Sequence, residues 1–276
     1  MKITVLVENT GTDAVRGAHG LSLYVETAEH RLLFDFGPDG ELLKENAAAL
    51  GIDLAAVDVA ILSHGHDDHA GGLKAFLETN DRAKVCAHRL AFLPHYSIRD
   101  GVLKEIGADA SLPEQYPGRI LLTEGVYRID ESLTLFSDIP GRELVSGANG
   151  TLFENGPDGT PVPDRFLHEQ DLLIREGDEL VLVAGCAHRG LVNVLRRAEE
   201  IGGRTPDAVV SGFHLTNPGM HRDEPEALIR AVGEALQGLP CRYHTGHCTG
   251  TGPFGILKEL LGDRLEALFC GRQFEI

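Results

Sequence analysis

The stretch Leu62–Leu73, LSHGHDDHAGGL, places three histidines and two aspartates within six consecutive residues. His64 and His66 are two residues apart, so in a loop both imidazoles can converge on one point, while Asp68 and His69 can face a second point nearby. Imidazole nitrogens and carboxylate oxygens suit Zn²⁺, and also Fe and Mn. Because such groups are costly to desolvate together without a partner, the spacing predicts one or two divalent metal ions. The alternative is a solvated polar turn that binds nothing.

The elements around this cluster can be predicted from hydrophobic periodicity. VDVAILSH is an apolar run of strand length that leads into the cluster, and AGGLKAFLETN, which follows it, is helical in pattern. KITVLVE, LSLYVET and RLLFDFG before it are expected as strands, and PDGELLKENAAALG as a helix. In the second half, strands alternate with helices. This mixture predicts an α/β (α+β) fold with mixed sheets and outer helices.

Residues 95–165 differ from the rest of the chain. They contain PEQYPG, GANG and NGPDGTPVPD, which are rich in Gly and Pro, so we expect an insertion or a lid there. Within it, IRDGVLKEIG (residues 98–107) is expected as a helix, and RILLTEGVYRI and LTLFSDI as strands. The whole chain, residues 1–276, is expected to form one domain.

The charge balance limits the classes of partner. The 25 Lys and Arg residues against 42 Asp and Glu give a formal net charge of −17, which repels nucleic acid and anionic membranes. A small anionic substrate remains compatible, because a local cation can dominate at a site. We expect no signal peptide and no membrane-spanning segment, because the sequence has no long apolar stretch. The five scattered cysteines favour a reducing, cytoplasmic setting. Its oligomeric state is not predicted.

The motif HGHDDH resembles the signature of the metallo-β-lactamase superfamily, His-x-His-x-Asp-His, at every specified position. The resemblance extends across nearly the whole chain and implies a four-layer αβ/βα sandwich with a hydrolase-type metal site. FDFG, which contains Asp35, is similar to the family's early motif, whose aspartate orients the ligand loop. The local alternative for Asp35 is an aspartate that caps the following turn.

The resemblance implies further ligands in the second half of the chain. His168, before a predicted hairpin, stands at a histidine position of the family, and Cys186 stands where a metal-bridging aspartate is usual, which is a departure. His188 lies two residues beyond, and we favour it over Cys186 as the ligand. His247 fits the last histidine ligand, and His214 is a candidate catalytic residue, metal ligand or substrate contact. The predicted ligands are therefore His64, His66, Asp68, His69, His188 and His247, with His168 and Cys186 as less favoured ones.

HEQ, GCAHRGLVN, SGFHL and HCTG together are similar to the dihydropteroate-synthase-like branch of the superfamily, which includes ribofuranosylaminobenzene 5′-phosphate–dihydropterin synthases. The resemblance implies an enzyme that acts on a small phosphorylated or pterin-like substrate, by hydrolysis or by alkyl transfer. Asp68 or His214 would handle a proton. Arg189 and Arg272 are candidate phosphate partners.

The alternative class of function is a non-catalytic module that senses metal or redox state. The formal net charge of −17 argues against a nuclease of the same superfamily.

Overall fold

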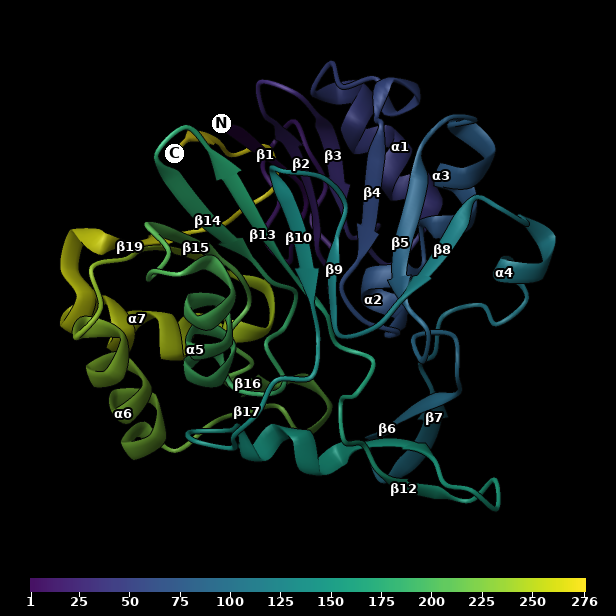
Figure 1. Cartoon of the computed structure of the whole chain (residues 1–276). Coiled ribbons are helices and arrows are strands. Elements are labelled where there is room, and N and C mark those ends of the chain that lie inside the picture. The colour runs from purple at the N-terminus through teal and green to yellow at the C-terminus, as the bar shows by residue number, and fades with distance from the viewer. The chain divides into compact units, whose positions relative to one another are not determined.

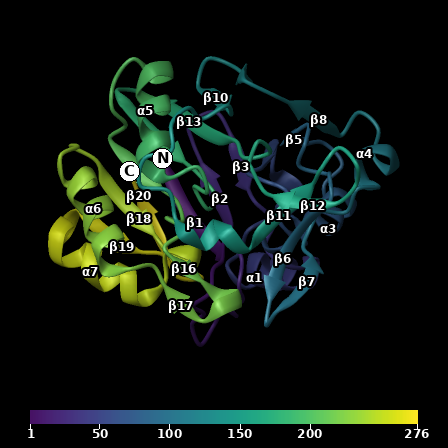
Figure 2. The same ribbon diagram turned by 90° about the horizontal axis from the view of Figure 1, so that it is seen from below.

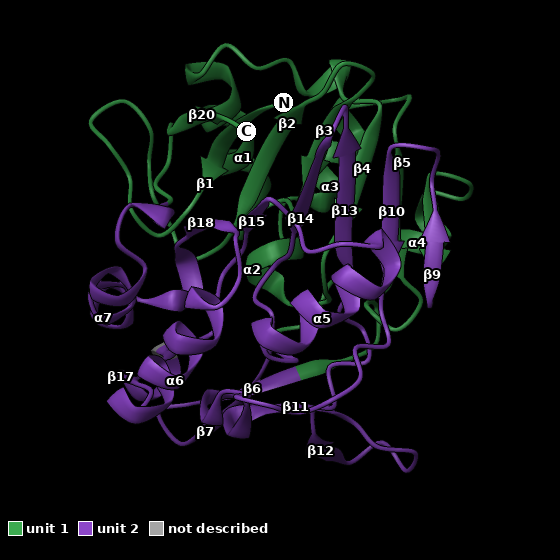
Figure 3. Ribbon diagram, turned by 60° about the vertical axis from the view of Figure 1, so that its left-hand side comes forward, with its two compact units in different colours: residues 1–95, 106–124, 268–276 green, residues 96–105, 125–267 purple. Residues whose placement is uncertain are grey.

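The computed structural model (Figure 1) describes residues 1–217 and 219–276 and divides the chain into two compact units. Unit 1 comprises Met1–His95, Ile106–Glu124 and Leu268–Ile276. Unit 2 comprises Tyr96–Glu105 and Gly125–Ala267 (Figure 3). Each unit contains one seven-stranded mixed sheet and its own helices, in agreement with the expected α/β (α+β) class.

The sheet of unit 1 has the order β20-β1-β2-β3-β4-β5-β8. Its strands are β1 (Lys2–Val7), β2 (Ser22–Glu26), β3 (Arg31–Phe34), β4 (Val59–Leu62), β5 (Lys84–His88), β8 (Ile120–Thr123) and β20 (Gln273–Glu275). From β20 to β3 the neighbours are antiparallel, and from β3 to β8 they are parallel. The edge pair joins the two ends of the chain, where the Ile276 amide donates to the Met1 carbonyl at 3.1 Å.

The helices of unit 1 are α1 (Gly40–Ala49), α2 (Asp67–Ala70), α3 (Leu73–Thr79) and α4 (Leu112–Gln115), with a 3₁₀ turn at Leu54–Ala56. Side chains of α1 and α3, among them Leu43 and Phe76, share one buried core with strand residues such as Leu33 and Leu62. The apolar strand β4 delivers the chain into the histidine-rich loop, and α2 and α3 follow it. The strand–turn–helix order expected around the cluster is therefore present.

Gly71, between α2 and α3, allows a close backbone approach. A Cβ added there would lie 1.9 Å from the Pro38 carbonyl oxygen, which belongs to the backbone and cannot rotate away. We expect Gly71→Ala to lower the free energy of unfolding by about 3 kcal/mol through overpacking. Urea denaturation of the variant measures this loss.

Gly255→Ala is the matched control for Gly71→Ala. Gly255 lies in α7 (Thr251–Leu261), and no atom lies within 4 Å of an added Cβ. There alanine should raise the free energy of unfolding by up to about 1 kcal/mol, because glycine is a poor helix former. Equal effects of the two substitutions would contradict the proposed clash with Pro38.

The sheet of unit 2 has the order β19-β18-β15-β14-β13-β10-β9. Its strands are β9 (Val126–Arg128), β10 (Leu133–Phe136), β13 (Asp171–Glu176), β14 (Glu179–Val183), β15 (Ala208–Val210), β18 (Arg242–Thr245) and β19 (Leu265–Ala267). Helices α5 (Leu191–Gly202), α6 (Glu226–Gln237) and α7 gather beside this sheet (Figure 2). They share a buried core with its strands, in which Tyr243 is fully buried.

A four-stranded sheet in the order β12-β11-β6-β7 and the short pair β16 (Thr216–Asn217) and β17 (Arg222–Asp223) complete the strands. The members of the four-stranded sheet are β6 (His95–Arg99), β7 (Val102–Glu105), β11 (Leu152–Asn155) and β12 (Pro161–Pro163). Between residues 95 and 165, β8, β9 and β10 belong to the large sheets, and the rest lies outside them. Among the described residues, no helix is both long and apolar enough to span a bilayer.

The helix expected over residues 98–107 is wrong, because these residues form most of the β6–β7 hairpin. Asp100 and Gly101 connect the strands with φ of 52° and 76°. An Asp-Gly pair with two positive φ angles is the preferred two-residue turn of a β-hairpin. All four residues of β7 are exposed, so this segment buries no apolar face that would favour a helix over the hairpin turn.

Candidate metal centre

Three of the predicted ligands lie together in unit 1. The ring centroid of His64 is 4.6 Å from that of His66 and 4.2 Å from that of His69, and all three side chains are buried. They come from the loop after β4 and from α2. Buried imidazoles this close need an electrostatic partner or a metal, because they cannot all become protonated together.

The Asp35 side chain is hydrogen-bonded to the loop that carries the three histidines. It is fully buried, and its backbone has a φ of 61°, which is uncommon for a residue other than glycine. Its Oδ1 accepts the Ser63 amide at 2.7 Å, and its Oδ2 accepts the Ser63 hydroxyl at 2.7 Å and His69 Nδ1 at 2.6 Å. The Ser63 hydroxyl in turn lies 2.8 Å from His64 Nδ1.

These contacts determine which nitrogen of each ring carries a proton. A carboxylate can only accept, so both the Ser63 hydroxyl and His69 Nδ1 donate to Asp35. The hydroxyl has then used its only proton and accepts from His64 Nδ1. In both histidines the lone pair therefore lies on Nε2, with Nδ1 held by an oxygen, which is the usual arrangement of metal-bound histidine. The residues of unit 1 thus fit a divalent metal ion.

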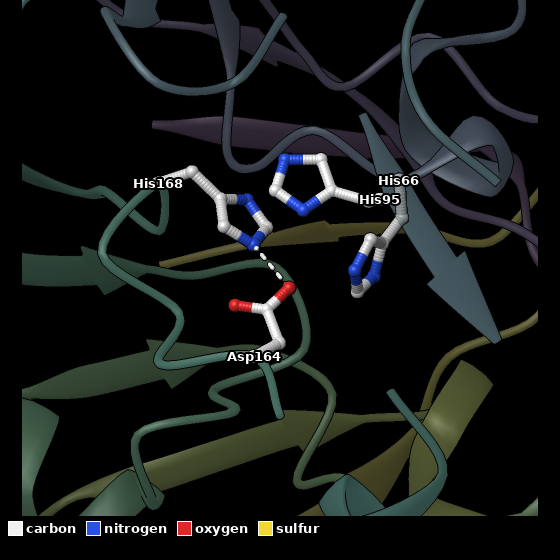
Figure 4. A group of neighbouring side chains, drawn as sticks. All are labelled: His66, His95, Asp164 and His168. Atoms are coloured by element: carbon white, nitrogen blue, oxygen red, sulfur yellow. Dashed lines mark hydrogen bonds and ion pairs between the residues drawn. The ribbon is translucent and has the colours of Figure 1, made fainter. Parts of the chain in front are cut away.

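Asp68 and His95 lie beside the same three histidines. Asp68 Oδ2 is 3.2 Å from His19 Nε2 and 3.8 Å from His69 Nε2. The rings of His66 and His95, both labelled in Figure 4, lie edge to face with centroids 5.7 Å apart. The role of Asp68 as ligand and proton carrier stays a prediction.

Unit 2 contains a second group of donors. Cys186, His188 and His214 each offer a ligand atom, and these atoms lie within 4.8 Å of one another. The same holds for Cys186 with His247 and Cys248, and all five residues are buried. The sequence left Cys186 and His188 as competing ligands, whereas the structure has both in one donor group.

The backbone at this second group is unusual. Ala187, His214 and His247 have φ of 52°, 47° and 51°, in the left-handed region that residues other than glycine rarely adopt. Such conformations cost free energy and cluster at functional sites. The backbone strain at these three positions supports a functional role for the group.

The ring of His188 is fixed on two sides. Asn149 Nδ2 donates to the His188 carbonyl at 2.8 Å, so its Oδ1 faces His188 Nδ1, 3.1 Å away, and must accept from it. His188 therefore has its lone pair on Nε2, like His64 and His69. Phe166 stacks on the ring with centroids 4.4 Å apart and planes 6° apart. These contacts orient His188 as a metal ligand would be oriented.

The surroundings of Cys248 lower the pKa of its thiol. Burial alone would raise the pKa of its thiol, but hydrogen bonds with Cys186 and His214 and the nearby His247 hold that pKa well below its usual range. Thiolates are the form in which cysteine binds metals. The donor group of unit 2 therefore combines imidazole and sulfur, a set that suits zinc.

His168, in unit 2, forms a pair with the carboxylate of Asp164. Its Nε2 is 3.2 Å from Asp164 Oδ2, and both side chains are buried (Figure 4). Asp164 Oδ1 also accepts the Phe166 amide at 2.6 Å. His168 is therefore held by a carboxylate in the way that His69 is held by Asp35, and its role as a ligand stays a prediction.

Glu169 fixes the loop that carries His188. Its Oε1 accepts the His188 amide at 2.7 Å and its Oε2 accepts the Arg189 amide at 2.9 Å. Burial raises the pKa of the Glu169 carboxyl from 4.5 to about 7, although the two backbone N–H groups oppose this shift. The carboxyl is thus easier to ionise in the unfolded chain than in the folded one.

This shift predicts a pH dependence of stability. Between about pH 4.5 and 7 the unfolded chain releases the Glu169 proton while the folded chain keeps it, so the free energy of unfolding should fall by about 3 kcal/mol as pH rises. The difference between wild type and Glu169→Gln, from urea denaturation with a chelator present, isolates this contribution. The same pH slope in both proteins would contradict the assignment.

The sequence did not indicate Ser63, Asn149 or Glu169 as functional residues. Ser63 stands next to His64 and Glu169 next to His168, so proximity to a motif is a weak signal for both. Asn149 is 39 residues from His188, and no local pattern links the two. The Arg272 guanidinium lies over the rings of Phe269 and Phe274, and its predicted role as a phosphate partner stays a prediction.

Two proteins of Methanocaldococcus jannaschii are similar to this chain over nearly its whole length. The chain is 33% identical over 265 residues to the uncharacterized protein MJ0448 of Methanocaldococcus jannaschii, with 94% of each sequence covered. It is 28% identical over 275 residues to 7,8-dihydropterin-6-methyl-4-(β-D-ribofuranosyl)-aminobenzene-5′-phosphate synthase of the same organism, covering 92% of this chain and 88% of that protein.

A solved structure and a family model point in the same direction. Tm1679, described as a metal-dependent hydrolase of the β-lactamase superfamily, superposes with a TM-score of 0.84 at 28% identity, covering 100% of this chain and 99% of that one. The model of the metallo-β-lactamase superfamily matches residues 15–247. The expected fold class is confirmed, and the chain belongs to the metallo-β-lactamase superfamily.

Proposed function

We propose that the chain is a metal-dependent enzyme that acts on a small phosphorylated or pterin-like substrate. The observation that carries this proposal is the network in which Asp35, directly and through Ser63, holds Nδ1 of His69 and His64. Such a network orients metal-binding histidines, whereas a solvated polar turn that binds nothing would not need it. The proposed cofactor is one or two divalent ions, with zinc as the first candidate and iron or manganese as alternatives.

The proposed ligands are His64, His66, Asp68, His69, His188 and His247. The sequence predicts that one centre draws on both donor groups, and this stays a prediction. When bound, a divalent ion polarises a phosphoryl or carbonyl oxygen as a Lewis acid. Around it, Asp35 and Asn149 orient imidazoles, and Asp68, paired with His19 at 3.2 Å, can receive and return a proton.

Two reaction classes are supported by relatives of similar identity. The relation to Tm1679 favours hydrolysis, and the relation to the synthase favours transfer of an alkyl group to an aromatic substrate. The neighbouring buried cysteines Cys186 and Cys248 support another class of function, a non-catalytic module that responds to metal or redox state. Turnover of a phosphorylated substrate by the metal-loaded protein separates an enzyme from such a module.

Metal content per chain tests the proposal first. Elemental analysis of protein purified without added metal or nickel affinity resin should find one or two zinc, iron or manganese ions per chain. Dialysis against a chelator should remove them, and titration with Zn²⁺ should restore them. Protein that contains no metal and takes up none on titration would contradict the proposal.

A further inference from the structure

Unit 2 contains a cavity of about 130 Å³ beside its donor group. The cavity is lined by three arginines, by one carboxylate and by the residues that hold the His188 ring. The lining residues are Arg142, Val145, Asn149, Asp164, Arg165, Phe166, His188 and Arg189. This volume is large enough for a small polar group such as a tetrahedral anion. The sequence indicated only Arg189 among these arginines.

The guanidinium of Arg189 is fixed in place by the backbone. Its Nη1 donates to the Arg165 carbonyl at 2.9 Å and its Nη2 to the Ile139 carbonyl at 2.8 Å. Carbonyl oxygens hold the group but do not neutralise it. Arg142 lines the same cavity, so two like charges face the same space.

The carboxylates near this cavity are already engaged. Arg165 forms an ion pair with Glu154 at 2.5 Å, and Asp164 is paired with His168 at 3.2 Å. Within the described part of the chain, no carboxylate oxygen lies within ion-pair distance of the Arg142 or Arg189 guanidinium. The nearby carboxylate of Glu169, which accepts the His188 and Arg189 amides, offsets part of this charge. In a chain of net charge −17, the two guanidinium groups beside one cavity are still a local excess of positive charge that favours an anion.

We propose that this cavity binds the phosphoryl group of the substrate, with Arg142 and Arg189 as its principal partners. Guanidinium groups present a planar fork of donors that matches phosphate oxygens. His188 forms part of the wall, so a bound phosphoryl group would lie next to the donor group of unit 2. The proposal rests on the proposed function and deepens it by naming the anionic group that the substrate carries.

The backbone of the cavity wall supports a built site. Phe166 has a φ of 54°, in the left-handed region, and Asp164 Oδ1 holds its amide at 2.6 Å. This conformation keeps the Phe166 ring stacked on His188. A bulky residue in the left-handed region is rare and costs free energy. Such a strained residue in the cavity wall indicates a functional site.

Calorimetric titration with inorganic phosphate and with pyrophosphate tests the cavity on the full-length protein as purified. Wild type should bind at least one of these anions, and Arg142→Gln should bind it at least about tenfold more weakly, because one charged partner is lost. Arg142→Lys, which keeps the charge but not the fork, should fall between them. Arg230→Gln, at an exposed arginine of α6 paired with Glu226 and Glu259, should bind like wild type.

A second variant separates this proposal from the metal centre. His66→Ala, which removes a proposed metal ligand, should keep the binding of the anion, whereas Arg142→Gln should keep the metal content. Binding lost in His66→Ala but retained in Arg142→Gln would mean that the anion sits on the metal, and it would overturn the arginine site. No binding by wild type would overturn it as well, while leaving the metal analysis unaffected.

Discussion

Replacing Asp35 by alanine should lower the free energy of unfolding by about 3–5 kcal/mol, the usual cost of removing one partner from a buried charged network. The substitution leaves the Ser63 amide, the Ser63 hydroxyl and His69 Nδ1 without their acceptor inside the core of unit 1. Urea denaturation in the presence of a chelator measures this loss without a contribution from metal.

The same variant should bind metal about 10- to 100-fold more weakly, because the rings of His64 and His69 lose the contacts that fix their orientation. Asp35→Asn is the matched comparison, since asparagine tolerates the φ of 61° and keeps the shape. It can still accept one hydrogen bond, so its losses should be smaller. An Asp35→Ala protein with the stability and zinc affinity of wild type would contradict the role assigned to Asp35.

Replacing His66 by alanine should remove most of the bound metal and lower metal-dependent turnover of a phosphorylated substrate more than about 100-fold, since it deletes a proposed ligand outright. The fold should survive, because the backbone hydrogen bond that the His66 carbonyl accepts from the Ala70 amide at 2.9 Å remains in the variant. Elemental analysis and an activity assay at saturating Zn²⁺ measure the two effects.

His221→Ala is the control for this substitution. His221 is 82% exposed, and its only described ion-pair contact is Asp100 at 4.0 Å. Surface pairs of this kind contribute little, so metal content and turnover should match those of wild type. Unchanged turnover in His66→Ala would remove the proposed centre, and equal losses in both variants would show that the assay does not report on the site.

The first half of the site could be predicted because its residues are neighbours in sequence. An apolar strand followed by His64, His66 and His69 predicts both the element and the candidate ligands. The FDFG motif indicated Asp35, which the structure places against His69. Local patterns were less informative at residues 98–107. There the preference of Asp100-Gly101 for a two-residue hairpin turn outweighed the helix-forming residues on either side, and the segment forms a hairpin.

The second half of the site depends on contacts between distant residues. Cys186 and His188 could not be separated as ligands by sequence, because a loop of this length can direct either side chain to the same point. Asn149, which fixes the His188 ring, and the arginines around the cavity come from segments that no periodicity connects. Such partners are brought together by tertiary folding, so a single sequence does not indicate them.

The pairing of β1 with β20 has a consequence for synthesis of the protein. The strand that covers the edge of β1 comes from residues 273–275, which a ribosome adds after every residue of unit 2. Until then a nascent chain would present β1 as an open edge, the kind of surface on which unfinished chains aggregate. Premature termination just before β20 should therefore yield a chain that depends on chaperones, although every candidate metal ligand has already been made.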